Sequence, residues 1–222
     1  MRNISIICND GEIMKKTAAM AVLSALAGLL GACGSPDYRY AHDSVEKVYF
    51  RVPYAWSIID QTEEFFKDRP AGASNAKPVR VWTIDSHQPP DPKNVDNVDS
   101  DMPVGQAQII SVSQGLGEAV SVSSVRASGF KFDPVSPATG LEDTWEVITD
   151  QPMRTKGGIS GSIAVFNHRE KATDPWLTQA REVFVDAARK RVYILDVFCT
   201  AKCYQQYERD IFDILDSWRI DA

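Results

Sequence analysis

The sequence contains little histidine and cysteine, no excess of basic charge and no apolar run long enough to cross a bilayer. Its three histidines and four cysteines are a poor supply for a metal centre, which needs about four nitrogen or sulfur ligands. Aspartate and glutamate (30) outnumber lysine and arginine (24), and the net charge of −6 repels the phosphate backbone of nucleic acid. The 44% hydrophobic and 24% charged residues are typical of an ordinary soluble fold, which excludes collagen, a coiled coil, a disordered chain and a polytopic membrane protein.

The N-terminal region has the pattern of a secretory signal peptide. Lys15 and Lys16 precede an apolar run, Ala18–Leu30, which is shorter than the ~20 residues that span a bilayer. The run ends in Leu-Gly-Ala-Cys, which resembles the lipobox of bacterial prolipoproteins, where the cysteine is lipidated and the chain is cut just before it. The resemblance implies that residues 1–32 are removed. A palmitate-bearing Cys33 would then hold the protein on the extracytoplasmic side of a bacterial cell membrane.

Residues 33–45 are interpreted as the lipidated cysteine and a short polar tether that contains Pro36. Residues 46–222 are enough for one globular domain and too few for two. The sequence leaves open whether translation starts at Met1 or Met14. It also leaves open a conventional signal peptide or an uncleaved anchor, in which Cys33 would be incidental.

Alternating apolar residues predict strands with one buried face. The first such strand runs from residue 46 to 53, where Val48, Phe50 and Val52 alternate with polar or aromatic residues. The same pattern predicts strands at 79–84, 108–113, 144–149, 159–167, 181–185 and 191–198. Hairpins without crossover helices imply an α+β fold, an antiparallel β-sheet with helices on its faces. Segments 57–66 and 119–126 fit either strand or helix.

The chain closes with a predicted helix over residues 201–218. Thr200 is a suitable N-cap, because its hydroxyl can accept from the first free backbone amides. Apolar residues recur at spacings of three and four and form one stripe for packing on a sheet: Tyr204, Tyr207, Ile211, Ile214, Leu215 and Trp218.

Both ends of the domain resemble PsbP-like proteins. The stretch Val48–Trp56 looks like the family's opening strand followed by Pro-x-x-Trp. The strand 192–198 with the helix that ends in Ile-Leu-Asp-Ser-Trp, residues 214–218, is similar to its close. The resemblance implies a PsbP-like α/β/α sandwich. It implies no activity, because these motifs determine the fold, and known members mostly bind or help to assemble something.

Cys199 and Cys203 form a C-x₃-C pair at the junction of the last strand and the last helix. In an exported protein such a pair is most often a disulfide. A helix start between the two residues allows the ~5.5–6 Å between Cα atoms that the bond prefers. Free thiols, redox chemistry and a metal site are the alternatives, but the redox motif is C-x-x-C and only His42, His87 and His168 could add nitrogen ligands.

Two segments invite comparison with functional motifs. Residues 85–103 are rich in proline and aspartate and predict a long, solvated surface loop. An EF-hand loop that starts at Asp99 would need glycine at its sixth position and glutamate at its twelfth, where the chain has Val104 and Ile110, so the pattern fails. Weak binding of a divalent cation stays open. The glycines at 157–161 do not fit a nucleophile elbow, because Ser162 stands where its last glycine belongs; they predict a turn.

These features predict a membrane-anchored, extracytoplasmic lipoprotein that serves as a non-enzymatic binding or assembly module of the cell envelope. The expected partners are the lipid bilayer, through acylated Cys33, and an unidentified envelope protein. No nucleic acid is expected, and no catalytic residue, metal or other cofactor is assigned. The alternative is an extracytoplasmic hydrolase whose site assembles from residues far apart in the sequence.

Overall fold

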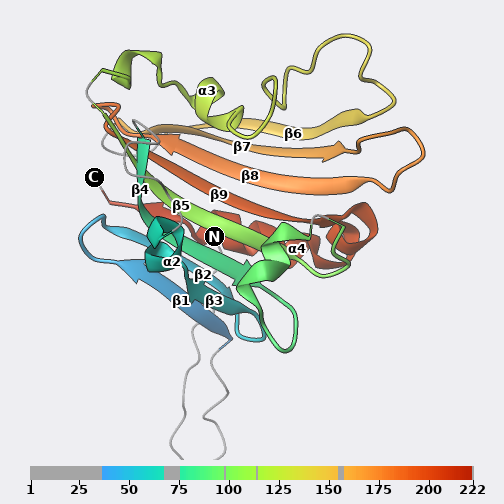
Figure 1. Ribbon diagram of the computed structural model, residues 1–222, viewed down its shortest axis with the longest axis horizontal. Helices are drawn as coiled ribbons and strands as arrows, with labels where there is room; N and C mark the ends of the chain where they lie inside the picture. Colours follow the sequence, from blue (N-terminus) through green and yellow to red (C-terminus); the bar gives the residue numbers. More distant parts are fainter. Residues whose placement is uncertain (1–36, 68–75, 98, 114, 155–157, 222) are drawn as a thin grey trace, which may run out of the picture. The chain divides into compact units, whose positions relative to one another are not determined.

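The computed structural model describes residues 37–67, 76–97, 99–113, 115–154 and 158–221 (Figure 1). They belong to one compact unit, Asp37–Ala222. The predicted signal peptide and Cys33 lie outside the described residues. Within them, no helix is long and apolar enough to span a membrane.

The larger of two sheets has seven strands, each antiparallel to its neighbours. Most neighbouring strands follow one another in the sequence, whereas the central pair joins strands far apart in the chain. In spatial order the strands are β3 (Ser57–Asp60), β4 (Ala76–Asp85), β5 (Val104–Val112), β9 (Arg191–Thr200), β8 (Leu177–Val185), β7 (Ser160–His168) and β6 (Trp145–Arg154). The antiparallel α+β class expected from the sequence is the class observed.

Both faces of this sheet are covered, which explains the uninterrupted burial of β8. On one face, Ala180 and Phe184 of β8 join the main core with α4 (Ala201–Ser217). On the other face, Val183 and Val185 form a smaller cluster with Val125 of α3 (Val122–Arg126). We call these the α4 face and the α3 face (Figure 1).

Helix α4 begins where the sequence predicts. The Thr200 hydroxyl accepts from the backbone N–H of Cys203 at 3.3 Å, which satisfies one of the unpaired amides of the first turn. The predicted apolar stripe packs on β2, β8 and β9, and its buried members are Tyr204, Ile211, Ile214, Leu215 and Trp218. The stripe is therefore part of the core.

The smaller sheet has three strands in the order β1 (Tyr38–Asp43), β2 (Val48–Pro53) and β10 (Arg219–Ile220). The predicted alternation in β2 is present, because Val48, Phe50 and Val52 are completely buried. The interpretation of residues 33–45 as a tether is wrong for Tyr38–Asp43, which pair with β2 along the whole strand. The error arose because β1 buries only Ala41 and Asp43, so its sequence looks polar.

Short helices border the α3 face. The segment 57–66 divides into strand β3 and helix α2 (Thr62–Lys67), and the segment 119–126 is helical, with η2 (Gly117–Ala119) preceding α3. Ser121 and Ser124 form a reciprocal capping box at the start of α3. The predicted loop 85–103 holds one short helix, η1 (Pro92–Asp96).

Candidate functional site

An open groove of about 780 Å³ lies between α2 and η1, over strands β4 and β5. We call it the α2–η1 groove. Its floor comes from Thr83 and Gln106, which lie on neighbouring strands. Its walls are formed by Asp60, Gln61, Glu63, Glu64, Phe65, Lys67, Pro92, Lys93, Val95 and Asp96.

Helix α2 is fixed to the sheet by hydrogen bonds at its first turn. The Asp60 carboxylate accepts from the backbone N–H of Thr62 at 2.9 Å, an arrangement typical of a helix start. The Thr62 hydroxyl accepts from the backbone N–H of Val81 at 3.0 Å, and Gln61 N–H donates to the Val81 carbonyl at 2.9 Å. This wall of the groove is therefore tied directly to β4.

Helix η1 is positioned by Asp85, which is completely buried. Its carboxylate accepts from the backbone amides of His87 and Asp91, at 2.9 and 2.8 Å, and from the side-chain amide of Asn94 at 2.9 Å. Burial raises the pKa of Asp85, but these hydrogen bonds outweigh burial and hold the pKa below its usual value. An ionised, fully bonded carboxylate thus fixes the second wall before any ligand arrives.

Carboxylates outnumber ammonium groups around the groove. The four acidic residues are Asp60, Glu63, Glu64 and Asp96, and the two basic ones are Lys67 and Lys93. Asp60 forms an ion pair with Arg80 at 3.0 Å, and Glu64 forms one with Lys67 at 2.8 Å. The groove therefore presents the side-chain amide of Gln106 on its floor and a negative rim, which suits a ligand that carries positive charge.

Asp85, His87 and Ser100 also have the order and spacing of a hydrolase triad. His87 Nδ1 lies 2.7 Å from Asp85, and His87 Nε2 lies 3.3 Å from Ser100 Oγ. Ser100, however, is only 1% exposed, and its hydroxyl donates to the Met102 carbonyl at 2.7 Å. A nucleophile must reach its substrate and pass its proton to the histidine, so this geometry favours a role in holding the loop.

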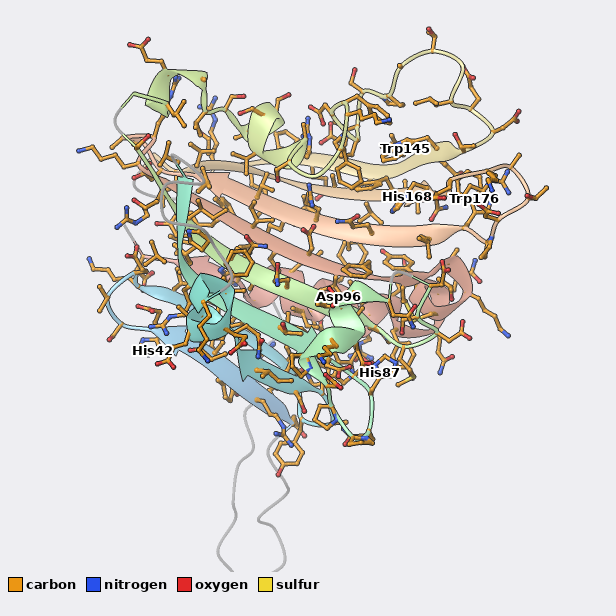
Figure 2. All side chains as sticks on the ribbon, viewed as in Figure 1. His42, His87, Asp96, Trp145, His168 and Trp176 are labelled. Carbon is orange, nitrogen blue, oxygen red and sulfur yellow. A yellow bond between two sulfur atoms is a disulfide. The ribbon has the colours of Figure 1, made fainter. Side chains whose placement is uncertain are left out.

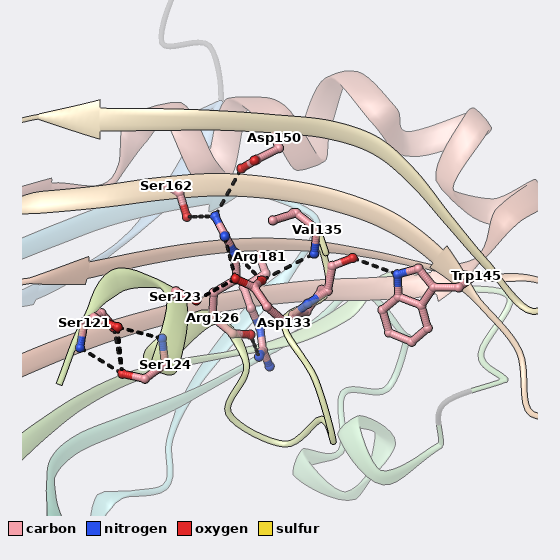
Figure 3. A network of polar contacts seen from close by, with 11 residues as sticks. Ser121, Ser123, Ser124, Arg126, Asp133, Val135, Trp145, Asp150, Ser162 and Arg181 are labelled. Atoms are coloured by element: carbon pink, nitrogen blue, oxygen red, sulfur yellow. Dashed lines mark hydrogen bonds and ion pairs between the residues drawn. The ribbon is translucent and has the colours of Figure 1, made fainter. Parts of the chain in front are cut away.

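A second polar network lies on the α3 face (Figure 3). Arg126 donates to both carboxylate oxygens of Asp133 at 2.7 Å and to Asp150 and Ser162 at 3.1 Å. Arg181 donates to the backbone carbonyls of Arg126 and Ser128. The donors of both arginines are thus occupied by protein groups, and the network ties residues 121–135 to the sheet.

The three histidines are distributed over separate elements (Figure 2). His42 lies in β1, His87 in the 85–103 loop, and His168 at the end of β7, where its ring stacks on Trp145 with the centroids 5.3 Å apart. Burial lowers the pKa of His168, and the charge of Arg181 lowers it further. Within the described part of the chain, no three histidine, cysteine, aspartate or glutamate side chains gather as metal ligands would.

Of the residues singled out from the sequence, Cys199 and Cys203 are joined in a disulfide with 5.9 Å between their Cα atoms. It lies at the junction of β9 and α4. Cys33 lies outside the described residues. The sequence pattern did not reveal the groove, because residues 85–103 have the composition of a solvated loop. The Asp-Pro start of η1 was the available signal, since aspartate caps helices and proline suits their first position.

No family model matches the chain, and no curated protein matches it in sequence. Three solved structures are similar to it in fold. PsbP (CyanoP) from the cyanobacterium Synechocystis is 13% identical and aligns over 87% of this chain and 100% of its own, with a TM-score of 0.47. The Ran-binding protein Mog1p from Saccharomyces cerevisiae is 9% identical over 84% of this chain and 96% of its own, with a TM-score of 0.44.

The third is LpqN of Mycobacterium tuberculosis, described as involved in cell envelope biogenesis. It is 13% identical over 83% of this chain and 91% of its own, with a TM-score of 0.45. The PsbP-like resemblance stated from the two ends of the sequence thus returns among the solved structures. At these identities the likeness concerns the fold alone.

Proposed function

We propose that this chain is a lipid-anchored module on the extracytoplasmic side of a bacterial membrane, where it binds an envelope partner in the α2–η1 groove without catalysing a reaction. The observation that carries the proposal is the groove itself. Its two walls are held by Asp60 and Asp85 through hydrogen bonds to backbone amides. A site that is ordered before binding loses little conformational entropy when the ligand arrives.

The charge of the groove indicates the kind of partner. Glu63 and Asp96 are exposed on opposite walls, and Gln106, which is partly exposed, offers a side-chain amide from the floor. A protein segment that carries lysine or arginine satisfies both features, because its side chains pair with the rim and its backbone bonds to the floor.

The anchoring part of the proposal rests on the sequence. Lys15, Lys16, the apolar run and Cys33 have the arrangement of a lipoprotein leader, and acyl chains on the cysteine would hold the domain at the bilayer. Cys33→Ser should abolish both processing and membrane partition. Metabolic labelling with an alkyne analogue of palmitate checks this, and a wild-type protein that incorporates no label would contradict it.

Site-specific photo-crosslinking in intact cells tests the groove. A photoreactive amino acid at Lys93 or Glu63 should give a discrete adduct with an envelope protein, whereas the same group at Gln205, exposed on α4, should not. The double variant Glu63→Lys/Asp96→Lys should lose the adduct, because the rim would then repel a cationic segment. Glu142→Lys/Glu208→Lys makes the same change of charge at exposed positions away from the groove and should retain it.

Adducts that form equally well at Gln205, or that survive reversal of the rim charge, would contradict a binding site in the groove. A hydrolase is the second candidate, because Asp85, His87 and Ser100 lie in line. It ranks second because the Ser100 hydroxyl is buried and already donates to Met102.

A further inference from the structure

The three-stranded sheet has one face packed on the core and one face open to solvent. The inward side chains of β1 and β2 are buried: Ala41, Asp43, Val48, Phe50 and Val52. The alternate side chains of the same strands point away from the core. With Arg219 of β10, they form what we call the outer face: Tyr38, Tyr40, His42, Tyr49, Arg51 and Arg219.

Tyrosine and arginine are paired across this face. Tyr40, which is 56% exposed, stacks on Tyr49 with the ring centroids 5.7 Å apart. The guanidinium of Arg51 lies 4.0 Å from the ring centroid of Tyr38.

The outer face carries two arginines, Arg51 and Arg219. Among the described residues, neither forms an ion pair. Arg219 instead donates to the backbone carbonyls of Asp216 and Trp218. A protein with a net charge of −6 thus has a face on which cationic groups predominate.

Arg51 and Arg219 also line a small pocket of about 170 Å³, together with Tyr49, Asp216 and Ser217. The Nε of Arg51 is buried and has no hydrogen-bond partner among the described residues. Asp216 is the carboxylate in the lining, so the pocket holds two cations and one anion.

The segment between Cys33 and β1 is short. Strand β1 begins at Tyr38, and Cys33 lies four positions before Asp37. A fully extended chain covers at most ~3.6 Å per residue, so the four-residue stretch from Cys33 to Asp37 spans at most about 14 Å. With Cys33 acylated as proposed, β1, which contributes Tyr38, Tyr40 and His42 to the outer face, would begin within this distance of the lipid.

We propose that the outer face lies directly on the membrane and binds the phosphate groups of anionic phospholipids. Tyrosine favours the membrane interface, and arginine beside an anionic leaflet adds affinity. The inference rests on the proposed anchoring at Cys33 for its location. The affinity of the face for lipid is a separate property, measured without the acyl chains.

Vesicle co-sedimentation tests it with a chain that begins at Gly34, which cannot be acylated at Cys33 and keeps the compact unit Asp37–Ala222 whole. We expect it to sediment with vesicles that contain one third phosphatidylglycerol and to remain in solution with phosphatidylcholine alone. Binding should weaken as salt is added. Arg51→Gln/Arg219→Gln should reduce the affinity roughly 30-fold, about 5-fold for each arginine.

Lys202→Gln/Arg209→Gln removes the same charge from exposed positions of α4 and should leave the affinity within about 2-fold, because charges away from the surface are screened. Should the double arginine variant prove misfolded by circular dichroism, Arg219→Gln alone and Tyr40→Ser, both at exposed positions, take its place. Arg219→Gln should still lower the affinity about 5-fold, and Tyr40→Ser should also weaken binding because it removes an interfacial ring.

No sedimentation with the anionic vesicles, or equal losses in the two double variants, would overturn the proposal. Absence of palmitate labelling together with arginine-dependent vesicle binding would refute the anchor and support the lipid-binding face. Labelling at Cys33 without vesicle binding would support the anchor and refute the face.

Discussion

Arg181 forms a two-pronged ion pair with Asp196 across strands β8 and β9: Nε and Nη2 donate to the two carboxylate oxygens at 2.6 and 2.8 Å. Arg181 is only 6% exposed, and Gln179 donates to the same carboxylate at 2.9 Å. Nη1 of Arg181 donates to the backbone carbonyls of Arg126 and Ser128. One buried cation therefore joins the two strands to the segment that follows α3.

Arg181→Met should destabilise the domain by about 3 kcal/mol, because it leaves the partly buried carboxylate of Asp196 without its charged partner. The double variant Arg181→Met/Asp196→Leu removes both charges and should recover much of that loss. Urea denaturation measures both, with Arg209→Met, at an exposed position of α4, as the control. A single variant that costs no more than this control would show that the pair does not hold the segment.

Glu182 makes the stability of the domain depend on pH. Its side chain is 1% exposed on the α4 face, and its Oε2 has no hydrogen-bond partner in the described residues. Burial raises the pKa of Glu182 well above its usual 4.5; nearby Arg219 opposes this effect and nearby Asp216 adds to it. Folding therefore favours the protonated carboxyl, and its stabilisation is complete below pH 4.5 and is lost as the pH rises through the folded-state pKa.

Glu182→Gln should remove this dependence, because an amide keeps the shape of the carboxyl without titrating. The stability of the variant relative to the wild type should rise by up to about 1.4 kcal/mol per pH unit above the usual pKa. Denaturation curves between pH 4 and 8 measure it, with exposed Glu142→Gln as the control. Parallel stability profiles for Glu182→Gln and the wild type would contradict the assignment.

Ile211→Ala tests the packing of α4. Ile211 is completely buried in the main core, so its truncation should cost about 2–5 kcal/mol, a large part of a typical domain stability of about 5–15 kcal/mol. Gln206→Ala, on the exposed side of the same helix, should cost less than about 0.5 kcal/mol. Similar unfolding midpoints for the two variants would mean that α4 does not pack as described.

Ser100 should not react with a fluorophosphonate probe, which labels serines activated by a neighbouring base. The hydroxyl is buried, so the probe cannot reach it. Its proton is directed at the Met102 carbonyl and is therefore not in position to transfer to His87. Labelling of the folded domain that disappears in Ser100→Ala and in His87→Ala would support the hydrolase instead. Ser123→Ala, a change of another serine outside this triple, is the control.

Local sequence patterns determined the elements whose buried residues repeat regularly. The alternation in β2 and the stripe of α4 were both readable, because a strand or helix that buries one side repeats its apolar residues with the period of the backbone. The Thr200 cap was readable for a similar reason, since its partner lies only three residues away. The disulfide between Cys199 and Cys203 could likewise be predicted from the sequence, because the two residues are only four positions apart.

The tertiary structure decided which polar residues are buried and which segments pair. The sequence of Tyr38–Asp43 is polar like a tether, and only the pairing with β2 shows that it is a strand. The sequence around Asp85 is that of a solvated acidic loop, and only the folded loop supplies the amides that bond to its buried carboxylate. The sequence around Glu182 does not indicate that its side chain is buried; its burial on the α4 face is a property of the folded domain. In each case the partner lies elsewhere in the chain or in the folded loop. The free energy of burying a polar or charged group depends on the partners that folding brings to it, which its neighbours in sequence do not determine.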